Sequence, residues 1–127
     1  LGLGPGLTPS GDDFIGSMLI TLHSMDLNET QTVLAKGVLE YAPTCTNPIS
    51  AQHLCAATEG LGSIRLHHLF KALHAGQDQA QALKDLTTIG HTSGWDALAG
   101  VYTTLKIWHD ATQKNGSGQS IENRCLF

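Results

Sequence analysis

The stretch GLGPGLTPSGDDFIGSML, residues 2–19, contains the features that decide the fold. Its first half holds four glycines and ends in Ser10-Gly11-Asp12-Asp13, whereas its second half is apolar at helical spacing. A serine in this position is typical of a helix start, and acidic residues in the first turn complement the positive end of the helix. Glycine allows backbone conformations that other residues avoid. The stretch therefore predicts a Gly-rich loop that leads directly into an amphipathic helix.

A second copy of this pattern lies near the other end of the chain. Ser10-Gly11-Asp12-Asp13 aligns with Ser93-Gly94-Trp95-Asp96, and the small pair Gly16-Ser17 then aligns without a gap with Ala99-Gly100. We interpret the match as an internal repeat of two Gly-rich helix starts. Small residues let two helices approach closely, so the repeat predicts that these helices pack together and bring their starts side by side. Two converging helix amino termini form an anion site.

Helical spacing of apolar residues also dominates the segments between the two copies. No segment shows the alternation of a strand, so the sequence predicts an all-α, compact bundle of about six helices. Residues 1–113 are expected to form one helical domain, and residues 114–127 a polar tail or linker. Trp95, Tyr102 and Trp108 on the last helix are expected in the core. The expected helix caps are Asn28, Asn47, Ser63 and Asp78, and the expected ends are Pro43, Gly60, Gly76 and Gly90.

Composition and charge exclude several classes of function. The 127 residues have a net charge of -4, and the seven Lys and Arg residues are scattered singly, which is not the basic stripe of a nucleic-acid-binding protein. No apolar stretch approaches the ~20 residues of a membrane span. The three cysteines are odd in number and lack metal-site spacing, which favours a cytoplasmic protein. Because the chain starts at Leu1 within a loop, it is expected to be the carboxy-terminal half of a longer protein.

The residues of the two Gly-rich starts are the candidates for a site. Asp13 recurs as Asp96 in the second copy, so it is expected to have the structural role of complementing the helix dipole. Asp12 has no counterpart, because Trp95 occupies the aligned position, and it is therefore the candidate for catalysis. His91, beside the second start, is the other catalytic candidate. No metal site and no cofactor are expected, with Mg²⁺ between an aspartate and a phosphate as the less favoured alternative. The expected substrate-binding residues are Gly4, Gly6, Thr8, Ser10, Gly11, Asp13, Thr92, Ser93, Gly94 and Asp96.

Residues 2–19 and IGHTSGWDALAGV, residues 89–101, resemble the two signature stretches of the bacterial AllH family. The resemblance extends from Gly2 to about Ile107 and implies a subunit associated with oxamate carbamoyltransferase in anaerobic allantoin (purine) breakdown. The reaction so implied moves a carbamoyl group between oxalurate and phosphate, giving oxamate and carbamoyl phosphate. The resemblance also implies as partners a small anionic substrate, a missing amino-terminal half, other subunits and a possible homo-oligomer. It implies no catalytic residues.

Two functions therefore remain open at the level of the sequence. In the first, the paired helix starts bind a small anionic substrate of a carbamoyltransferase, with backbone N–H groups and the hydroxyls of Ser10, Thr92 and Ser93 as donors. In the second, the chain is a non-catalytic helical interaction domain whose Gly-rich stretches are only tight turns. The first predicts that the turns line a cleft, and the second that neighbouring helices cover them.

Overall fold

The computed structural model describes residues 1–116, which form six helices and no strand. The predicted all-α class and the compact helical bundle are therefore confirmed. Each expected helix is present, with ends that differ by a few residues from those expected. The bounds are α1 Ser10–Ser24, α2 Asn28–Cys45, α3 Pro48–Thr58, α4 Ile64–His74, α5 Ala80–Thr87 and α6 Ser93–Gly116.

Three of the four predicted cap residues accept hydrogen bonds from backbone amides at a helix start, although the N-cap of α5 is Gln79 rather than Asp78. Asn47 Oδ1 accepts hydrogen bonds from the amides of Ile49 and Ser50 at 3.0 Å each. Ser63 Oγ and Asp78 Oδ1 accept one amide each, at 3.3 and 2.9 Å. Such caps satisfy helix amides that have no partner within the helix.

Two expectations for α2 are wrong, namely that Asn28 caps its start and that Pro43 ends it. Leu27 rather than Asn28 is the N-cap residue, and no side chain caps this helix. Gln31, the expected partner of Asn28, is instead buried and donates to the carbonyl of Thr58 at the end of α3. Tertiary contact between α2 and α3 thus replaces a local cap. The helix also continues past Pro43 to Cys45, since a proline near the last turn removes only one hydrogen bond.

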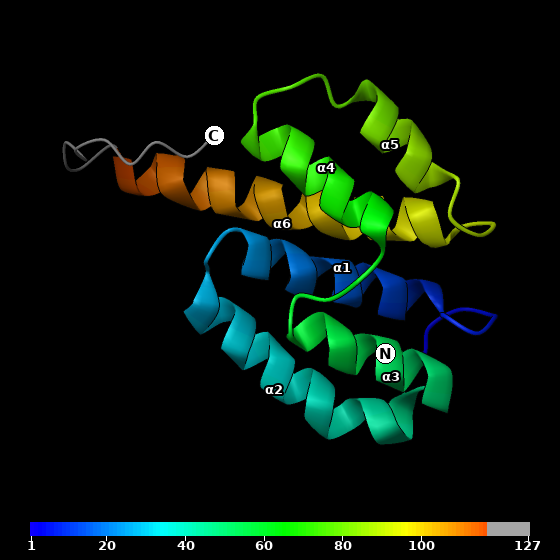
Figure 1. Cartoon of the computed structure of the whole chain (residues 1–127). Coiled ribbons are helices and arrows are strands. Elements are labelled where there is room, and N and C mark those ends of the chain that lie inside the picture. The colour runs from blue at the N-terminus through cyan, green and yellow to red at the C-terminus, as the bar shows by residue number, and fades with distance from the viewer. Residues whose placement is uncertain (117–127) are drawn as a thin grey trace.

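Helices α1 and α6 lie side by side and run in the same direction through the middle of the bundle (Figure 1). Helices α2 and α3 pack on one side of this pair, and α4 and α5 on the other (Figure 1). The core lies between these layers, where leucines from α1, α3, α4 and α5 are almost completely buried: Leu19, Leu54, Leu69 and Leu86.

The contact between α1 and α6 depends on one glycine. A Cβ on Gly100 would lie 2.0 Å from Ser17 Oγ and 2.3 Å from the carbonyl oxygen of Phe14. The predicted packing of the two helices is thus observed, with Ser17 and Gly100 at the contact. The other two small residues lie elsewhere, because Gly16 faces Leu54 and Ala57 of α3 and Ala99 is exposed.

Hydrogen bonding repeats along the two helices in the register of the sequence repeat. Thr21 Oγ1 donates to the carbonyl of Ser17 at 2.7 Å, and the aligned Thr104 Oγ1 donates to the carbonyl of Gly100 at 2.9 Å. Both threonines are buried, at 0% and 4% exposure. The internal repeat is therefore a repeat of structure as well as of sequence.

The outer face of α6 differs from the expectation. Trp95 and Tyr102 are 60% and 63% exposed, so their assignment to the core is wrong. They occur seven residues apart, on the face opposite the one that packs on α1. The helix continues to Gly116, past the expected domain boundary at residue 113, and the rest of the expected tail lies outside the described residues. No helix within residues 1–116 is long and apolar enough to span a bilayer.

We expect Gly100→Ala to lower the free energy of unfolding by about 2–3 kcal/mol, because the backbone of α1 would have to move away. Gly16→Ala is the matched control: its Cβ would make ordinary contacts at 3.8 Å and gain about 1 kcal/mol of helix propensity. Urea unfolding followed by circular dichroism measures both. Equal stability of the two variants would contradict the proposed close contact.

Candidate functional site

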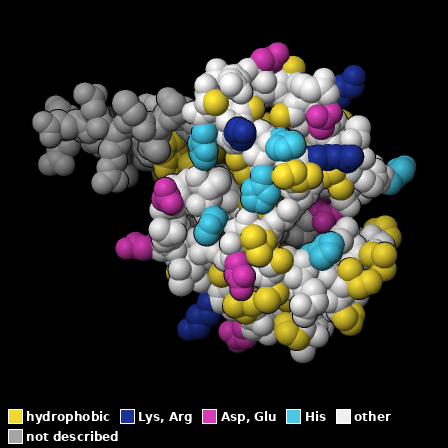
Figure 2. Space-filling model, viewed as in Figure 1, with side chains coloured by type: hydrophobic (Ala, Val, Ile, Leu, Met, Phe, Trp, Pro, Cys, Tyr) yellow, Lys and Arg dark blue, Asp and Glu magenta, His cyan; other side chains and the backbone are white. Residues whose placement is uncertain are grey.

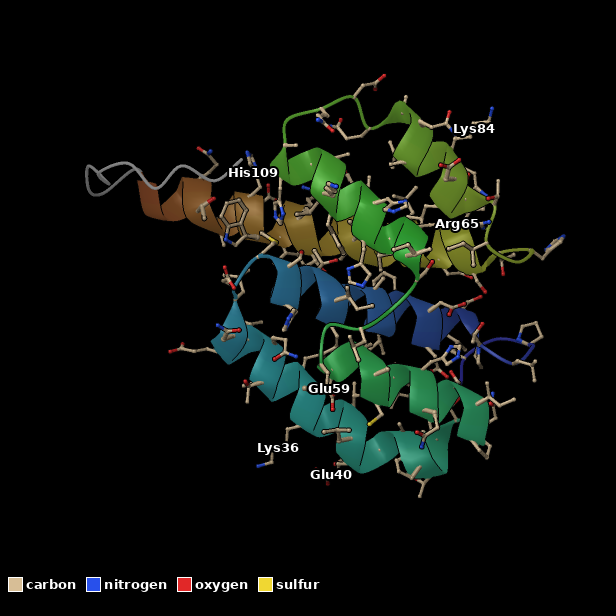
Figure 3. All side chains as sticks on the ribbon, viewed as in Figure 1. Lys36, Glu40, Glu59, Arg65, Lys84 and His109 are labelled. Atoms are coloured by element: carbon tan, nitrogen blue, oxygen red, sulfur yellow. The ribbon has the colours of Figure 1, made fainter. Side chains whose placement is uncertain are left out.

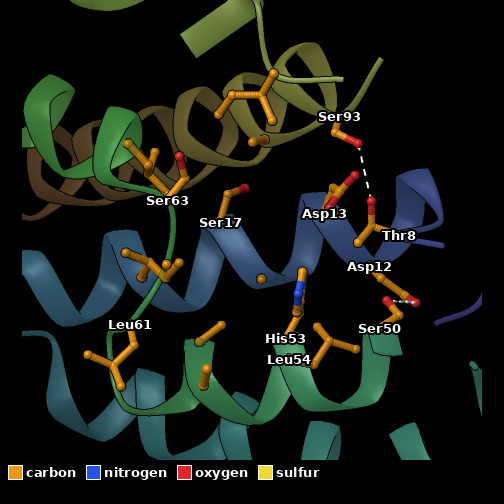
Figure 4. Close-up of a pocket in the computed structure, with 18 of the residues that line it drawn as sticks. Thr8, Asp12, Asp13, Ser17, Ser50, His53, Leu54, Leu61, Ser63 and Ser93 are labelled. Atoms are coloured by element: carbon orange, nitrogen blue, oxygen red, sulfur yellow. Dashed lines mark hydrogen bonds between the residues drawn. The ribbon is translucent and has the colours of Figure 1, made fainter. Parts of the chain in front are cut away.

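The two Gly-rich starts meet at one end of the bundle, as the sequence predicts. Thr8, just before α1, and Ser93, the first residue of α6, share a hydrogen bond of 3.2 Å between their hydroxyls (Figure 4). The side chain of Asp13 lies beside this pair in the same view (Figure 4). Residues 85 positions apart in the sequence are thus joined at the mouth of a single site.

The backbone amides of both starts are already hydrogen-bonded to their own loops. In α1, the amide of Gly11 donates to Leu3 and those of Asp12 and Asp13 to Pro9, at 2.8–3.1 Å. The aligned amides of α6 repeat this pattern with the carbonyls of Ile89 and Thr92, at 2.8–3.0 Å: Gly94, Trp95 and Asp96. These six amides are therefore not available to an anion without a change in the loops.

A cavity of about 650 Å³ opens between α1, α3, the start of α4 and the start of α6. Most of its polar side chains lie at one end, where the two helix starts meet, whereas Ser17 and Ser63 lie farther along the cavity (Figure 4). Its other end is mostly apolar and is lined by residues from α1, α3, the α3–α4 connection, α4, α5 and the α5–α6 connection. A concave, mostly apolar site with a few polar groups at one end is typical of small-molecule binding. The apolar lining includes Ile20, Leu54, Leu61, Leu66, Leu86 and Ile89.

Asp12 is buried and accepts hydrogen bonds at both of its carboxylate oxygens. It is only 3% exposed, and Oδ1 accepts a hydrogen bond from the amide of Gly2 at 2.7 Å. Oδ2 accepts from the hydroxyls of Ser50, at 2.6 Å, and Thr46. Burial raises the pKa of Asp12, but hydrogen bonds from Ser50, Thr46 and Gly2 outweigh burial and lower it below its usual value. Asp12 therefore ties the loop and the start of α3 to α1.

Asp13, by contrast, has a carboxylate oxygen without a hydrogen-bond partner. It lines the cavity, and its Oδ2 atom is buried without a hydrogen-bond partner. Burial raises the pKa of Asp13, and the charge of Asp96 raises it further. The nearby hydroxyls of Ser93 and Thr8 and the imidazole of His53 act in the opposite direction but do not cancel the increase. A carboxyl group that holds its proton more tightly than usual is suited to proton transfer.

Asp96 repeats this feature in α6, since its Oδ2 atom is also buried without a partner. Each of these half-buried carboxylates makes ionisation of the other more costly, because like charges in a poorly solvated site repel. The repeated aspartates therefore form a pair in which the charge of Asp96 contributes to the raised pKa of Asp13. This pairing follows directly from the parallel packing of α1 and α6.

His53 of α3 is a residue that sequence reasoning did not select. It lines the cavity opposite Asp13 and lowers the pKa of that residue through its charge (Figure 4). Its only sequence signal is its place one turn after Ser50, which also lines the cavity. An isolated histidine in a helix gives no sign of what it faces until the helices are packed.

The structure brings together only part of the predicted set. Four predicted residues line the cavity: Thr8, Asp12, Asp13 and Ser93. Eight do not: Gly4, Gly6, Ser10, Gly11, His91, Thr92, Gly94 and Asp96.

The positions of these eight have physical reasons. His91 and Thr92 are exposed on the turn before α6, which projects from the bundle (Figure 1). Gly4 and Gly6 are exposed and have φ angles of 118° and 98°, so the loop conformation itself accounts for glycine there. Gly94 is buried, and its Cβ would lie 2.2 Å from the carbonyl of Leu86. The remaining three, Ser10, Gly11 and Asp96, are half-buried at the helix starts.

Within residues 1–116, no group of three or more His, Cys, Asp or Glu side chains is placed to hold a metal ion. Of the three aspartates near the helix starts, Asp12 accepts hydrogen bonds at both carboxylate oxygens, whereas Asp13 and Asp96 each have one oxygen without a partner. The expectation that the site uses no metal, with Mg²⁺ as the less favoured alternative, stays a prediction.

The two adjacent aspartates should respond oppositely to mutation. Asp12→Asn replaces acceptors with a donor and leaves buried donors unpaired, which should cost about 1–3 kcal/mol at pH 7. Asp13→Asn removes a carboxylate that is costly to ionise and should leave stability unchanged or increase it. Urea unfolding of both variants measures the difference. Greater destabilisation by Asp13→Asn would contradict these environments.

The pH dependence has a defined sign. Asp12 has a lowered pKa when folded, so its stabilisation is present above the unfolded pKa of about 3.9 and is lost as pH falls through the lower folded value. Asp13 has a raised pKa when folded, so its ionisation destabilises the folded state. This destabilisation is absent below the unfolded pKa of about 3.9 and complete above the higher pKa of the folded state. Both variants should therefore approach wild-type stability in acid.

Comparison with known proteins supplies the family. No solved structure matches the chain. A family model described as oxamate carbamoyltransferase subunit AllH matches residues 1–105, which include all six helix starts and every residue that lines the cavity. The description names a subunit, so other subunits are implied. The chain therefore belongs to the AllH family of oxamate carbamoyltransferase subunits.

Proposed function

We propose that this chain contributes a carbamoyl-transfer site to its complex, with Asp13 as the proton-transfer group. The observation that supports this most is the buried, unpartnered Oδ2 atom of Asp13 in a residue that lines a cavity of about 650 Å³. The proposal gives Asp13 the chemical role that the sequence assigned to Asp12. Asp12 is already fully hydrogen-bonded, so it has a structural role instead.

The chemistry needs one well-placed proton. In the direction that consumes oxalurate, a phosphate oxygen attacks the carbamoyl carbon and the bond from that carbon to the oxamate nitrogen breaks. The nitrogen keeps the electron pair and must gain a proton to leave as the amide of oxamate. An aspartic acid with a raised pKa can donate this proton, and in the reverse direction the aspartate can accept it.

The anionic end of the substrate requires donors, and the cavity offers side chains rather than backbone amides. Ser93 and Thr8 place their hydroxyls beside Asp13, and His53 faces it from α3 (Figure 4). Ser63, at the start of α4, lines the same cavity. Ser93, Thr8 and His53 would face a small carboxylate or phosphate beside Asp13, and Ser63 lies farther along the cavity (Figure 4). The apolar side chains would keep water away from the reacting carbon and strengthen these interactions.

The test is steady-state carbamoyl transfer from oxalurate to phosphate by the complex assembled from the full-length subunits. Asp13→Asn should lower kcat by about 10²–10⁴-fold while the protein stays folded. Asp26→Asn is the matched control, since Asp26 is exposed at the end of α1 and asparagine tolerates its φ of 55°. The two variants thus make the same Asp→Asn change, one at a residue that lines the cavity and one at a residue that does not. Full activity of Asp13→Asn would remove the residue from the mechanism.

One observation favours the second candidate function, a helical interaction domain. Trp95 and Tyr102 present two aromatic side chains on the outer face of α6. Exposed aromatic residues are enriched at protein interfaces, and a subunit must contact its partners somewhere. This face lies away from the cavity, so docking there is compatible with a site at Asp13. It would be the sole function only if the complex kept full activity with the cavity residues replaced.

A further inference from the structure

A second cavity, of about 580 Å³, lies between the end of α1 and α4. It shares only Ile20 with the cavity at Asp13. In the connection between α3 and α4, Gly60 lines the second cavity and Gly62 lines the first. This connection packs on Ile20, since a Cβ on Gly62 would lie 2.5 Å from the Ile20 side chain. The two cavities are therefore separate sites on either side of this connection. The second is lined by Ile20, His23, Ser24, Gly60, His67, Phe70, Lys71, His74 and Ala75.

Basic and ionisable side chains from two helices meet at this second cavity. His67, Lys71 and His74 lie four and three residues apart, so they share one face of α4. His23 reaches the same space from α1. None of the described lining residues is an aspartate or glutamate, although the whole chain has a net charge of -4. Figure 2 shows several histidine side chains gathered near lysine and arginine on the face that contains α4.

The backbone makes room for one of these imidazoles. A Cβ on Gly60 would lie 2.3 Å from the ring of His23, so only glycine allows the α3–α4 connection to pass this close to the histidine. The ring of His67 is in turn placed edge-on against Phe70, with 6.5 Å between ring centroids. Two of the four side chains are thus held in position by their surroundings.

The helix dipole explains these residues only in part. His23 lies in the last turn of α1, and Lys71 and His74 lie in the last turn of α4, where positive charge is favourable. His67 lies in the middle of α4 and gains nothing from the dipole. The dipole also gives no reason for His23 to face the same cavity as residues of another helix.

We infer that this second cavity binds a small oxyanion, namely a phosphate or phosphate-ester group, between Lys71 of α4 and the imidazoles of His23 and His67. An ammonium group and protonated imidazoles donate charge-assisted hydrogen bonds, and a phosphate offers several acceptor oxygens to donors that converge from different helices. His23 lies ten residues after Asp13 in α1, which corresponds to about 15 Å of helix. A phosphate bound here therefore takes no part in proton transfer at Asp13, and the site does not depend on the proposed carbamoyl transfer.

The experiment titrates the full-length protein at pH 6, where histidine side chains gain charge, with inorganic phosphate and separately with phenyl phosphate. Histidine ring signals in NMR spectra report the binding. Saturable shifts of His23 and His67, without shifts of His91 and His109, are the expected result. The probe that binds more tightly shows whether free phosphate or a phosphate ester is the better ligand. Failure of both probes to bind would overturn the inference.

Substitutions then locate the site. Lys71→Gln and His67→Gln should each weaken phosphate binding about tenfold or more. Lys84→Gln and His109→Gln are the matched controls, because these side chains extend from α5 and α6 outside the cavity (Figure 3). If Lys71→Gln fails to fold, His67→Gln still tests the site from the middle of α4. Equal weakening by control and test variants would show general charge attraction and would overturn the inference, as would wild-type binding by Lys71→Gln or His67→Gln.

Discussion

The close parallel contact between α1 and α6 is the constraint on which the rest of the structure depends. Gly100 lies against Ser17 and the backbone of Phe14, at a separation that no side chain would permit. Parallel helices in contact have their amino termini at the same end, which places Thr8 beside Ser93. The other four helices pack in pairs on the two sides of this central pair. The cavity at the helix starts is thus a direct result of the small-residue contact.

The same contact gives two neighbouring aspartates different chemistry. Asp13 recurs as Asp96 in the second repeat, so the packing brings two carboxylates together, and each keeps one buried oxygen without a donor. Asp12 faces α3, whose start supplies hydroxyls that hold its charge. Its counterpart Trp95 points away from the bundle. The pKa of Asp12 is therefore lowered and that of Asp13 raised, as the proposed role of Asp13 in proton transfer requires.

Periodicity and caps were enough to predict the fold class, the number of helices and the pairing of the repeats. These features are local or depend on a repeated motif, and Asn47 and Ser63 form the caps that the sequence predicts. The roles of Asp12 and Asp13 could not be predicted, because each depends on side chains from α3 and α6 that are distant in the sequence. His53 was missed for the same reason. The exposure of Trp95 depends on which face of α6 packs against α1.

The central claim is that the packing of α1 on α6 raises the pKa of Asp13 and leaves Asp12 ionised. Carbon-13 NMR of the aspartate carboxyl groups, titrated from acid to neutral pH, measures both residues in one sample. The account predicts that Asp13 titrates above the ordinary value for aspartate and Asp12 below it. It also predicts that Asp96→Asn lowers the pKa of Asp13. An Asp13 carboxyl that titrates at or below the ordinary value, unchanged by Asp96→Asn, would contradict the account.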